Sequence, residues 1–115
     1  TDTVQGFIAA ASCDAIVGGV TNIGSGFEIS IGDTAKLIAE VMGVEIACDS
    51  DAVRLRPDAS EVERLFAGTA KAEAHLGWAP EFAGRDGFRR GLSVTAEWFR
   101  DPANLACYKT GRYNI

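Results

Sequence analysis

The residues best suited to chemistry stand close together, in the stretch Arg54–Leu65. Pro57 locks one backbone angle and pushes the residue before it into extended geometry, so we expect Arg56 to project from a stiff loop. An arginine held in this way offers a planar, permanently charged fork that suits the oxygens of a phosphate. Five residues on, Glu61 could accept hydrogen bonds from the two neighbouring hydroxyls of a ribose. The alternative is a loop arginine in a surface ion pair, which contributes little to stability.

Other residues of chemical interest fit simpler roles. Gly19, Gly24 and Gly26 do not have the Gly-x-Gly-x-x-Gly spacing that a dinucleotide pyrophosphate needs, so we expect them to form a turn. The acidic run 49–51 lacks a third ligand pattern and is predicted to be a solvated turn rather than a cation site. His75, the one histidine, has no acid or nucleophile at a suggestive spacing and is predicted to be a surface or capping residue.

The composition argues against several classes of partner. The chain has 115 residues, of which 47% are hydrophobic, enough for one globular unit with a modest core. A formal net charge of −5 argues against nucleic acid or an anionic membrane. No apolar run approaches the ~20 residues of a bilayer-spanning helix, and no secretory leader is recognisable. The three cysteines are far apart and odd in number, which favours reduced thiols and a cytoplasmic protein (Cys13, Cys48 and Cys107).

Several segments, in order, resemble the C-terminal part of the extended short-chain dehydrogenases/reductases, the NAD-dependent epimerase/dehydratase family. The similar segments are Asn22–Ile31, Arg54–Leu65, Thr69–Ala72, Leu76–Pro80 and Tyr108–Ile115. The Ser60-Glu61-Val62 form most resembles the branch of UDP-N-acetylglucosamine 4,6-dehydratase-like and GDP-mannose 4,6-dehydratase-like enzymes.

The resemblance implies a binding role for the central stretch. Arg56 would contact the diphosphate of a nucleotide sugar, Glu61 the ribose, and Arg54 would be a secondary contact. Three residues separate Pro57 from Glu61, where some relatives have one. An ion pair with Asp51 is the alternative for Arg54.

The resemblance also implies what the chain does not carry. The parent enzyme would use NAD with a glycine-rich turn and a Tyr-x-x-x-Lys pair, whose ammonium lowers the phenol pKa. Neither motif occurs in the 115 residues, so the chain alone is expected to bind no cofactor and to be inactive. We therefore interpret residues 1–115 as the substrate-binding portion of a 4,6-dehydratase or epimerase, without its N-terminal Rossmann domain. The alternative is a free-standing, non-catalytic binding or assembly module derived from the same family.

The hydrophobic pattern predicts a small, mixed α/β fold. Helices are expected from Asp2 or Thr3 to about Ser12, from the Ser30–Asp33 capping box to Gly43, over 70–76, and from about 86 to 100. Strands are expected over 20–23, 27–31, 44–48 and 64–67. Asp2 is interpreted as a helix cap. Because the first helix presents one apolar face, and the 20–23 strand an open edge, we also expect self-association through these surfaces (Val4, Phe7, Ile8).

Overall fold

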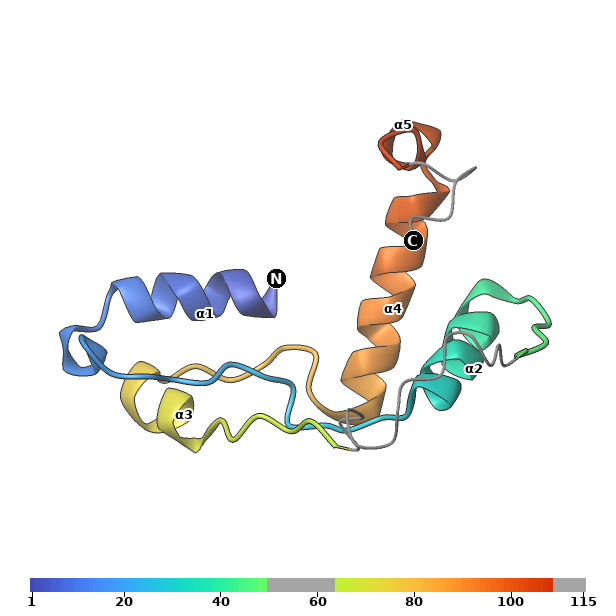
Figure 1. Cartoon of the computed structure of the whole chain (residues 1–115). Coiled ribbons are helices and arrows are strands. Elements are labelled where there is room, and N and C mark those ends of the chain that lie inside the picture. Colours follow the sequence, from blue (N-terminus) through green and yellow to red (C-terminus); the bar gives the residue numbers. More distant parts are fainter. Residues whose placement is uncertain (50–63, 109–115) are drawn as a thin grey trace.

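Helices joined by extended segments make up the described part of the chain. The computed structural model describes residues 1–49 and 64–108. The elements are α1 (Asp2–Ala11), the 3-10 turn η1 (Asp14–Ile16), α2 (Ile31–Met42), α3 (Ala70–Leu76), α4 (Gly84–Arg100) and α5 (Pro102–Leu105). In Figure 1, α1 lies along the extended segments at one end, while α4 stands across their direction and carries α5 at its tip.

The two described ranges contain no β-strand, so the predicted mixed α/β fold is wrong for them. The segments 20–23, 44–48 and 64–67 are neither helix nor strand, and 27–31 is irregular up to the start of α2. Alternating residues favour extended backbone, but a strand also requires a ladder of hydrogen bonds to a neighbour. Within the described residues, no backbone hydrogen bond joins 20–29 to 64–69.

Two of these extended segments nevertheless run side by side in opposite directions. The ammonium of Lys71 donates to the carbonyl of Val20 at 2.6 Å, and Arg64 pairs with Glu28. Between these contacts, a Cβ built on Gly24 would lie 2.7 Å from the Cβ of Ala67. As residue numbers rise from 20 to 28 in one segment, those of their partners fall from 71 to 64 in the other. The two segments are therefore antiparallel, and side chains hold them together. Gly24 is required here because its neighbour leaves no room for a side chain.

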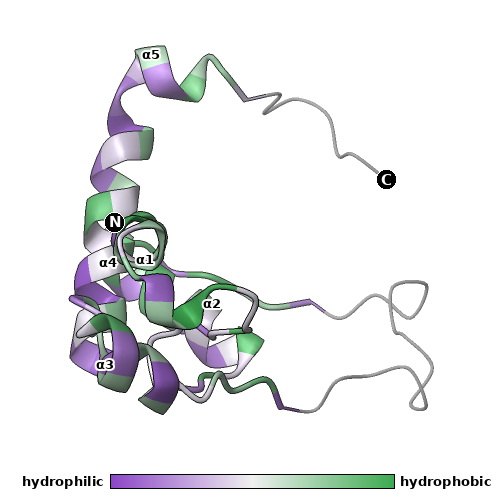
Figure 2. Cartoon of the chain, turned by 90° about the vertical axis from the view of Figure 1, so that its left-hand side faces the viewer, coloured by the Kyte–Doolittle hydropathy of each residue, from purple (hydrophilic) through white to green (hydrophobic). Residues whose placement is uncertain are grey.

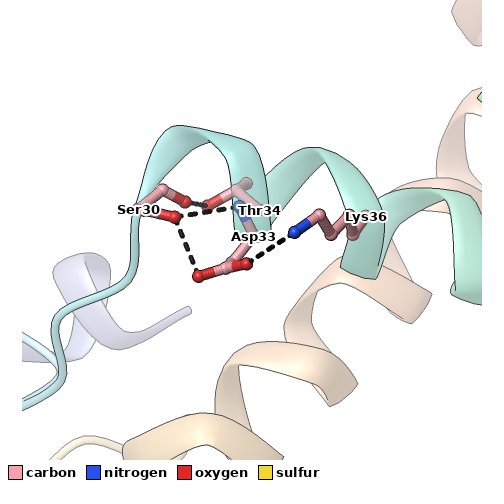
Figure 3. Close-up of polar contacts among 4 residues, drawn as sticks. All are labelled: Ser30, Asp33, Thr34 and Lys36. Atoms are coloured by element: carbon pink, nitrogen blue, oxygen red, sulfur yellow. Dashed lines mark hydrogen bonds and ion pairs between the residues drawn. The ribbon is translucent and has the colours of Figure 1, made fainter. Parts of the chain in front are cut away.

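The predicted second helix is confirmed, with both of its ends set by local chemistry. The hydroxyl of Ser30 accepts from the backbone N–H of Asp33 at 3.0 Å and donates to the carboxylate of Asp33 at 2.9 Å (Figure 3). The Asp33 carboxylate also accepts from Lys36 at 3.3 Å. At the other end, Gly43 adopts a left-handed conformation with φ 68°, as a glycine C-cap does.

The remaining helices follow the prediction closely in position. The third begins and ends where expected, and Gly77 closes it with φ 59°. Helix α4 begins at Gly84, two residues before the predicted start, and packs against α2 and α5. Gly87 of α4 is buried beneath the backbone of Phe82, and a Cβ built on it would lie 2.2 Å from the Phe82 carbonyl carbon. This close approach explains why the sequence places a glycine in a helix interior.

The hydrophobic core is small. Among the described residues, the buried hydrophobic side chains are Leu37, Ala39, Ala72 and Trp78. The Cα radius of gyration is 17.6 Å, whereas a compact domain of this length would have about 13 Å. No helix in the described ranges is long and apolar enough to cross a bilayer.

Helix α1 carries large apolar side chains that are exposed rather than buried. Val4, Phe7 and Ile8 are 58%, 73% and 55% exposed, and Val20, in the extended segment after η1, is 81% exposed. Figure 2 shows hydrophobic residues along α1, which is seen there nearly end-on. The apolar face of α1 is therefore turned outward, while its inward side carries the small residue Gly6.

Candidate functional site

The three residues predicted to bind substrate, Arg54, Arg56 and Glu61, lie outside the described residues. Their roles therefore stay predictions. The described chain resumes at Arg64, which is still part of the stretch Arg54–Leu65. The structure can thus show how the end of that stretch is held.

Arg64 is held by Glu28, a residue that the sequence analysis did not single out. Its Nε donates to Oε1 of Glu28 at 3.2 Å, and its Nη2 donates to Oε2 in a second, shorter bond. This two-bond fork fixes the relative orientation of the two groups as well as their distance. The only signal in the sequence was an acid on one predicted strand and a base on another, which is too common to identify a pair.

The pairing changes the proton affinity of both groups. The hydrogen bond from Arg64, and secondarily its positive charge, lower the pKa of the Glu28 carboxyl. The hydrogen bond to Glu28, with its negative charge, raises the pKa of the Arg64 guanidinium. The Glu28 side chain is 30% exposed and that of Arg64 is 79% exposed. Since the pair faces solvent, we expect its main effect to be positional rather than stabilising.

An open hollow adjoins this ion pair. It has a volume of about 500 Å³ and is lined by Glu28, Arg64 and Phe66. The Phe66 side chain is 57% exposed. An anion entering the hollow would meet one cation already engaged by a carboxylate. The hollow alone therefore offers little net attraction for a phosphate.

The N-terminus of α1 forms the second concentration of polar contacts. The two carboxylate oxygens of Asp2 accept from the backbone N–H groups of Glu81 and Phe82, each at 3.1 Å. The backbone carbonyl of Asp2 accepts from the indole Nε1 of Trp78 at 3.2 Å. Thr1 occupies the N-cap position, and no side chain caps the helix. The interpretation of Asp2 as a helix cap is therefore wrong, because its carboxylate is used 79 and 80 residues away in the chain.

A groove lies beside this junction. Its volume is about 560 Å³, within the range of small-molecule sites. Its walls are mainly apolar and come from α1, the 23–25 segment and α4, with Ile23, Phe82, Phe88 and Leu92 among the lining residues. Asp2 is the one acidic side chain in the lining, and both of its oxygens are already bonded. The groove has the size of a ligand site without a free charged group to do chemistry.

His75 was predicted to be a surface or capping residue, and residues 50–51 of the predicted acidic turn lie outside the described residues. His75 is exposed on α3, and its backbone carbonyl accepts from the Cys13 thiol at 3.3 Å. Within the ranges 1–49 and 64–108, no three His, Cys, Asp or Glu side chains gather as a metal site would require.

The described residues do not fit a dinucleotide. Gly24 lies against Ala67, so that glycine serves chain packing rather than close approach by a phosphate. At the start of α2, the first helix after the glycines, the N–H of Asp33 is already satisfied by Ser30.

Two curated proteins of Arabidopsis thaliana are similar to part of the chain. GDP-L-fucose synthase 1 is 38% identical over 78 residues, which cover 68% of this chain and 21% of that protein. Putative GDP-L-fucose synthase 2 is 36% identical over 78 residues, with the same coverage. The chain thus spans about a fifth of the length of these relatives.

These similarities support the wider resemblance to the nucleotide-sugar epimerase/dehydratase type of short-chain dehydrogenase/reductase. They do not support the 4,6-dehydratase branch in particular. No family model matches the chain. No solved structure is significantly similar to it.

Proposed function

We propose that the chain is the nucleotide-sugar-binding portion of an extended short-chain dehydrogenase/reductase. The observation that carries the proposal is the similarity, over 78 residues, to two proteins named GDP-L-fucose synthase. The order and spacing of the family-like segments along the chain support the same conclusion.

Within this proposal, the stretch Arg54–Leu65 binds the nucleotide sugar. Arg56 contacts the diphosphate through its planar fork, Glu61 accepts from the ribose hydroxyls, and Arg54 is the secondary cation. The Glu28–Arg64 pair supports these roles, because it tethers the chain three residues after Glu61 to a neighbouring segment. Remote contacts of this kind hold the sugar in a fixed place relative to the reacting groups.

The reaction of the parent enzyme would be a 4,6-dehydration or an epimerisation through a transient 4-keto sugar. NAD bound by a separate dinucleotide-binding portion would supply the hydride exchange at the sugar. The present chain contributes orientation of the substrate and no acid or base, since it has no Tyr-x-x-x-Lys pair. In isolation it would be inactive.

The second candidate is a non-catalytic binding or assembly module. It shares with the first candidate the lack, within the 115 residues, of both motifs that the family uses for catalysis. Such a module could bind a nucleotide sugar as well, so binding does not separate the two candidates. They differ in whether a Rossmann portion belongs to the same polypeptide.

Calorimetry on the 115-residue chain tests the shared claim of binding. We expect UDP or GDP to bind and Arg56→Ala to weaken that binding, whereas Arg89→Ala, at an exposed arginine of α4, leaves it unchanged. NAD is expected not to bind. A folded chain that binds neither nucleoside diphosphate would overturn the proposed role, and micromolar NAD binding would overturn the assignment to the substrate portion.

A further inference from the structure

The hydrogen bonds that helix α1 makes with distant parts of the chain lie at its first turn. Asp2 supplies three of the contacts, through two carboxylate oxygens and one carbonyl oxygen. The two carboxylate bonds are charge-assisted, and bonds to charged groups are about twice as strong as neutral ones. We call Glu81 and Phe82, whose amides receive Asp2, the Phe82 turn.

Beyond its first turn, α1 packs against α3, and Cys13, just after the helix, donates a hydrogen bond to the His75 carbonyl at 3.3 Å. Its one buried residue is Gly6, which rests on the side chain of Ile23. Its large apolar side chains, Val4, Phe7 and Ile8, are more than half exposed. A helix that turns its apolar face outward gains little burial energy from docking.

The chain after α1 permits a change of direction. Gly18 has φ 75°, in the left-handed region, and no atom lies within 4 Å of the position its Cβ would take. A glycine in open space can change its backbone angles without a clash, as a hinge requires.

The Phe82 turn, by contrast, is fixed from the other side by α4. The guanidinium of Arg90 donates to the carbonyl of Glu81 at 2.8 Å and lies 5.8 Å from the centre of the Phe82 ring. Gly87 packs directly against the Phe82 backbone. The turn would therefore keep its place if α1 left it.

The space beneath α1 is incompletely filled. A hollow of about 350 Å³ lies between α1, the 21–23 segment and α3, and Thr21 is among its lining residues. The hydroxyl of Thr21 is buried and has no hydrogen-bond partner in the described structure. Because the hollow has room for water, this part of α1 adds little close packing that would oppose its release.

We infer that α1 is a detachable strap, hinged near Gly18 and latched to the Phe82 turn by the carboxylate of Asp2. Opening of the strap exposes Ile23 and the hollow at Thr21 while α2 and α4 stay folded. The inference concerns α1 and does not depend on the proposed nucleotide-sugar binding.

Hydrogen–deuterium exchange of the 115-residue chain tests this inference. In the wild type, the amides of α1, Glu81 and Phe82 should exchange through one common opening, faster than those in the middle of α2 and α4. Asp2→Asn removes the charge and turns an N–H group toward an N–H donor. It should speed exchange at α1 and the Phe82 turn roughly 10- to 100-fold, with α2 unchanged. The control Asp14→Asn, at an exposed acid of η1, should change neither.

Two results would overturn the strap. One is unchanged exchange of α1 in Asp2→Asn, and the other is equal acceleration in α1, α2 and α4, which would mean global destabilisation. If Asp2→Asn does not fold, exchange of the wild type at low urea concentrations gives the answer. The strap requires the amides of α1, Glu81 and Phe82 to lose protection together, at a lower urea concentration than the amides of α2 and α4.

Discussion

Arg64 and Glu28 stand 36 residues apart in the chain and share two hydrogen bonds. The pair lies where the predicted binding stretch rejoins the described structure, so it ties that stretch to the 20–28 segment. Because the Glu28 carboxyl keeps access to solvent, its ionisation can be followed directly.

We expect the Glu28 carboxyl to titrate below an ordinary glutamate, because Arg64 lowers its pKa. A lowered folded-state pKa stabilises the fold above the unfolded-state pKa of about 4.3, and this contribution is lost as pH falls through the folded-state value. Carbon-detected NMR titration measures the midpoint. Arg64→Gln should raise it toward the ordinary value. The Asp33 carboxyl, whose pKa is lowered first by Ser30, should not respond and serves as the control.

Alanine substitutions at two glycines of α4 should change the stability of the chain in opposite directions. A Cβ at Gly87 would meet the Phe82 carbonyl carbon at 2.2 Å, whereas one at Gly91 would lie 3.5 Å from the Phe82 ring, an ordinary contact. We expect Gly87→Ala to destabilise the chain by about 1–3 kcal/mol through overpacking. Gly91→Ala should stabilise it by up to ~1 kcal/mol through helix propensity. Urea unfolding followed by circular dichroism gives the change in the free energy of unfolding for each variant. Changes of the same sign would contradict the close packing of Gly87 against Phe82.

In a full-length parent enzyme, Arg56→Ala should weaken nucleotide-sugar binding by ~2 kcal/mol, because a charge-assisted contact to the diphosphate is lost. That is roughly a 30-fold rise in the dissociation constant. The affinity for NAD should barely change, and Arg89→Ala should affect neither ligand. Comparable losses for both ligands would mean that Arg56 supports the structure rather than the diphosphate.

Self-association of the isolated chain should depend on the outward face of α1. Phe7 is 73% exposed there, beside Val4 and Ile8, and small monomers seldom leave such a patch uncovered. Sedimentation at low micromolar concentration should show an oligomer that Phe7→Ser weakens. Ile31→Ser is the matched control, since Ile31 is 87% exposed on a different helix. A stable wild-type monomer would instead favour the free-standing module.

Helix positions were predictable because their ends depend on nearby residues. Ser30 caps α2 with an amide three residues away, and Gly43 and Gly77 take the left-handed conformation that ends a helix. These signals act within one turn, so they can be read from the sequence without knowledge of the fold.

Strands and long-range contacts were not predictable in the same way. Alternation over 20–23 and 64–67 indicates extended backbone but cannot supply the hydrogen-bonding neighbour that makes a strand. Asp2 has the residue type and position of a cap, yet its carboxylate binds amides 79 and 80 residues later. The predicted site residues Arg54, Arg56 and Glu61 lie outside the described structure, so their prediction stands on the sequence and on the family resemblance.

The small core has a thermodynamic consequence. Unfolding changes heat capacity in proportion to the apolar surface that it newly exposes, and here Leu37 and Trp78 are the large apolar side chains already buried in the described ranges. The melting endotherm should therefore be low and broad, with a heat-capacity step below the ~12–15 cal/mol/K per residue of ordinary domains. A partner that covers α1 would increase the heat-capacity change on unfolding and sharpen the endotherm. The shape of the calorimetric peak therefore reports whether a partner is bound to α1.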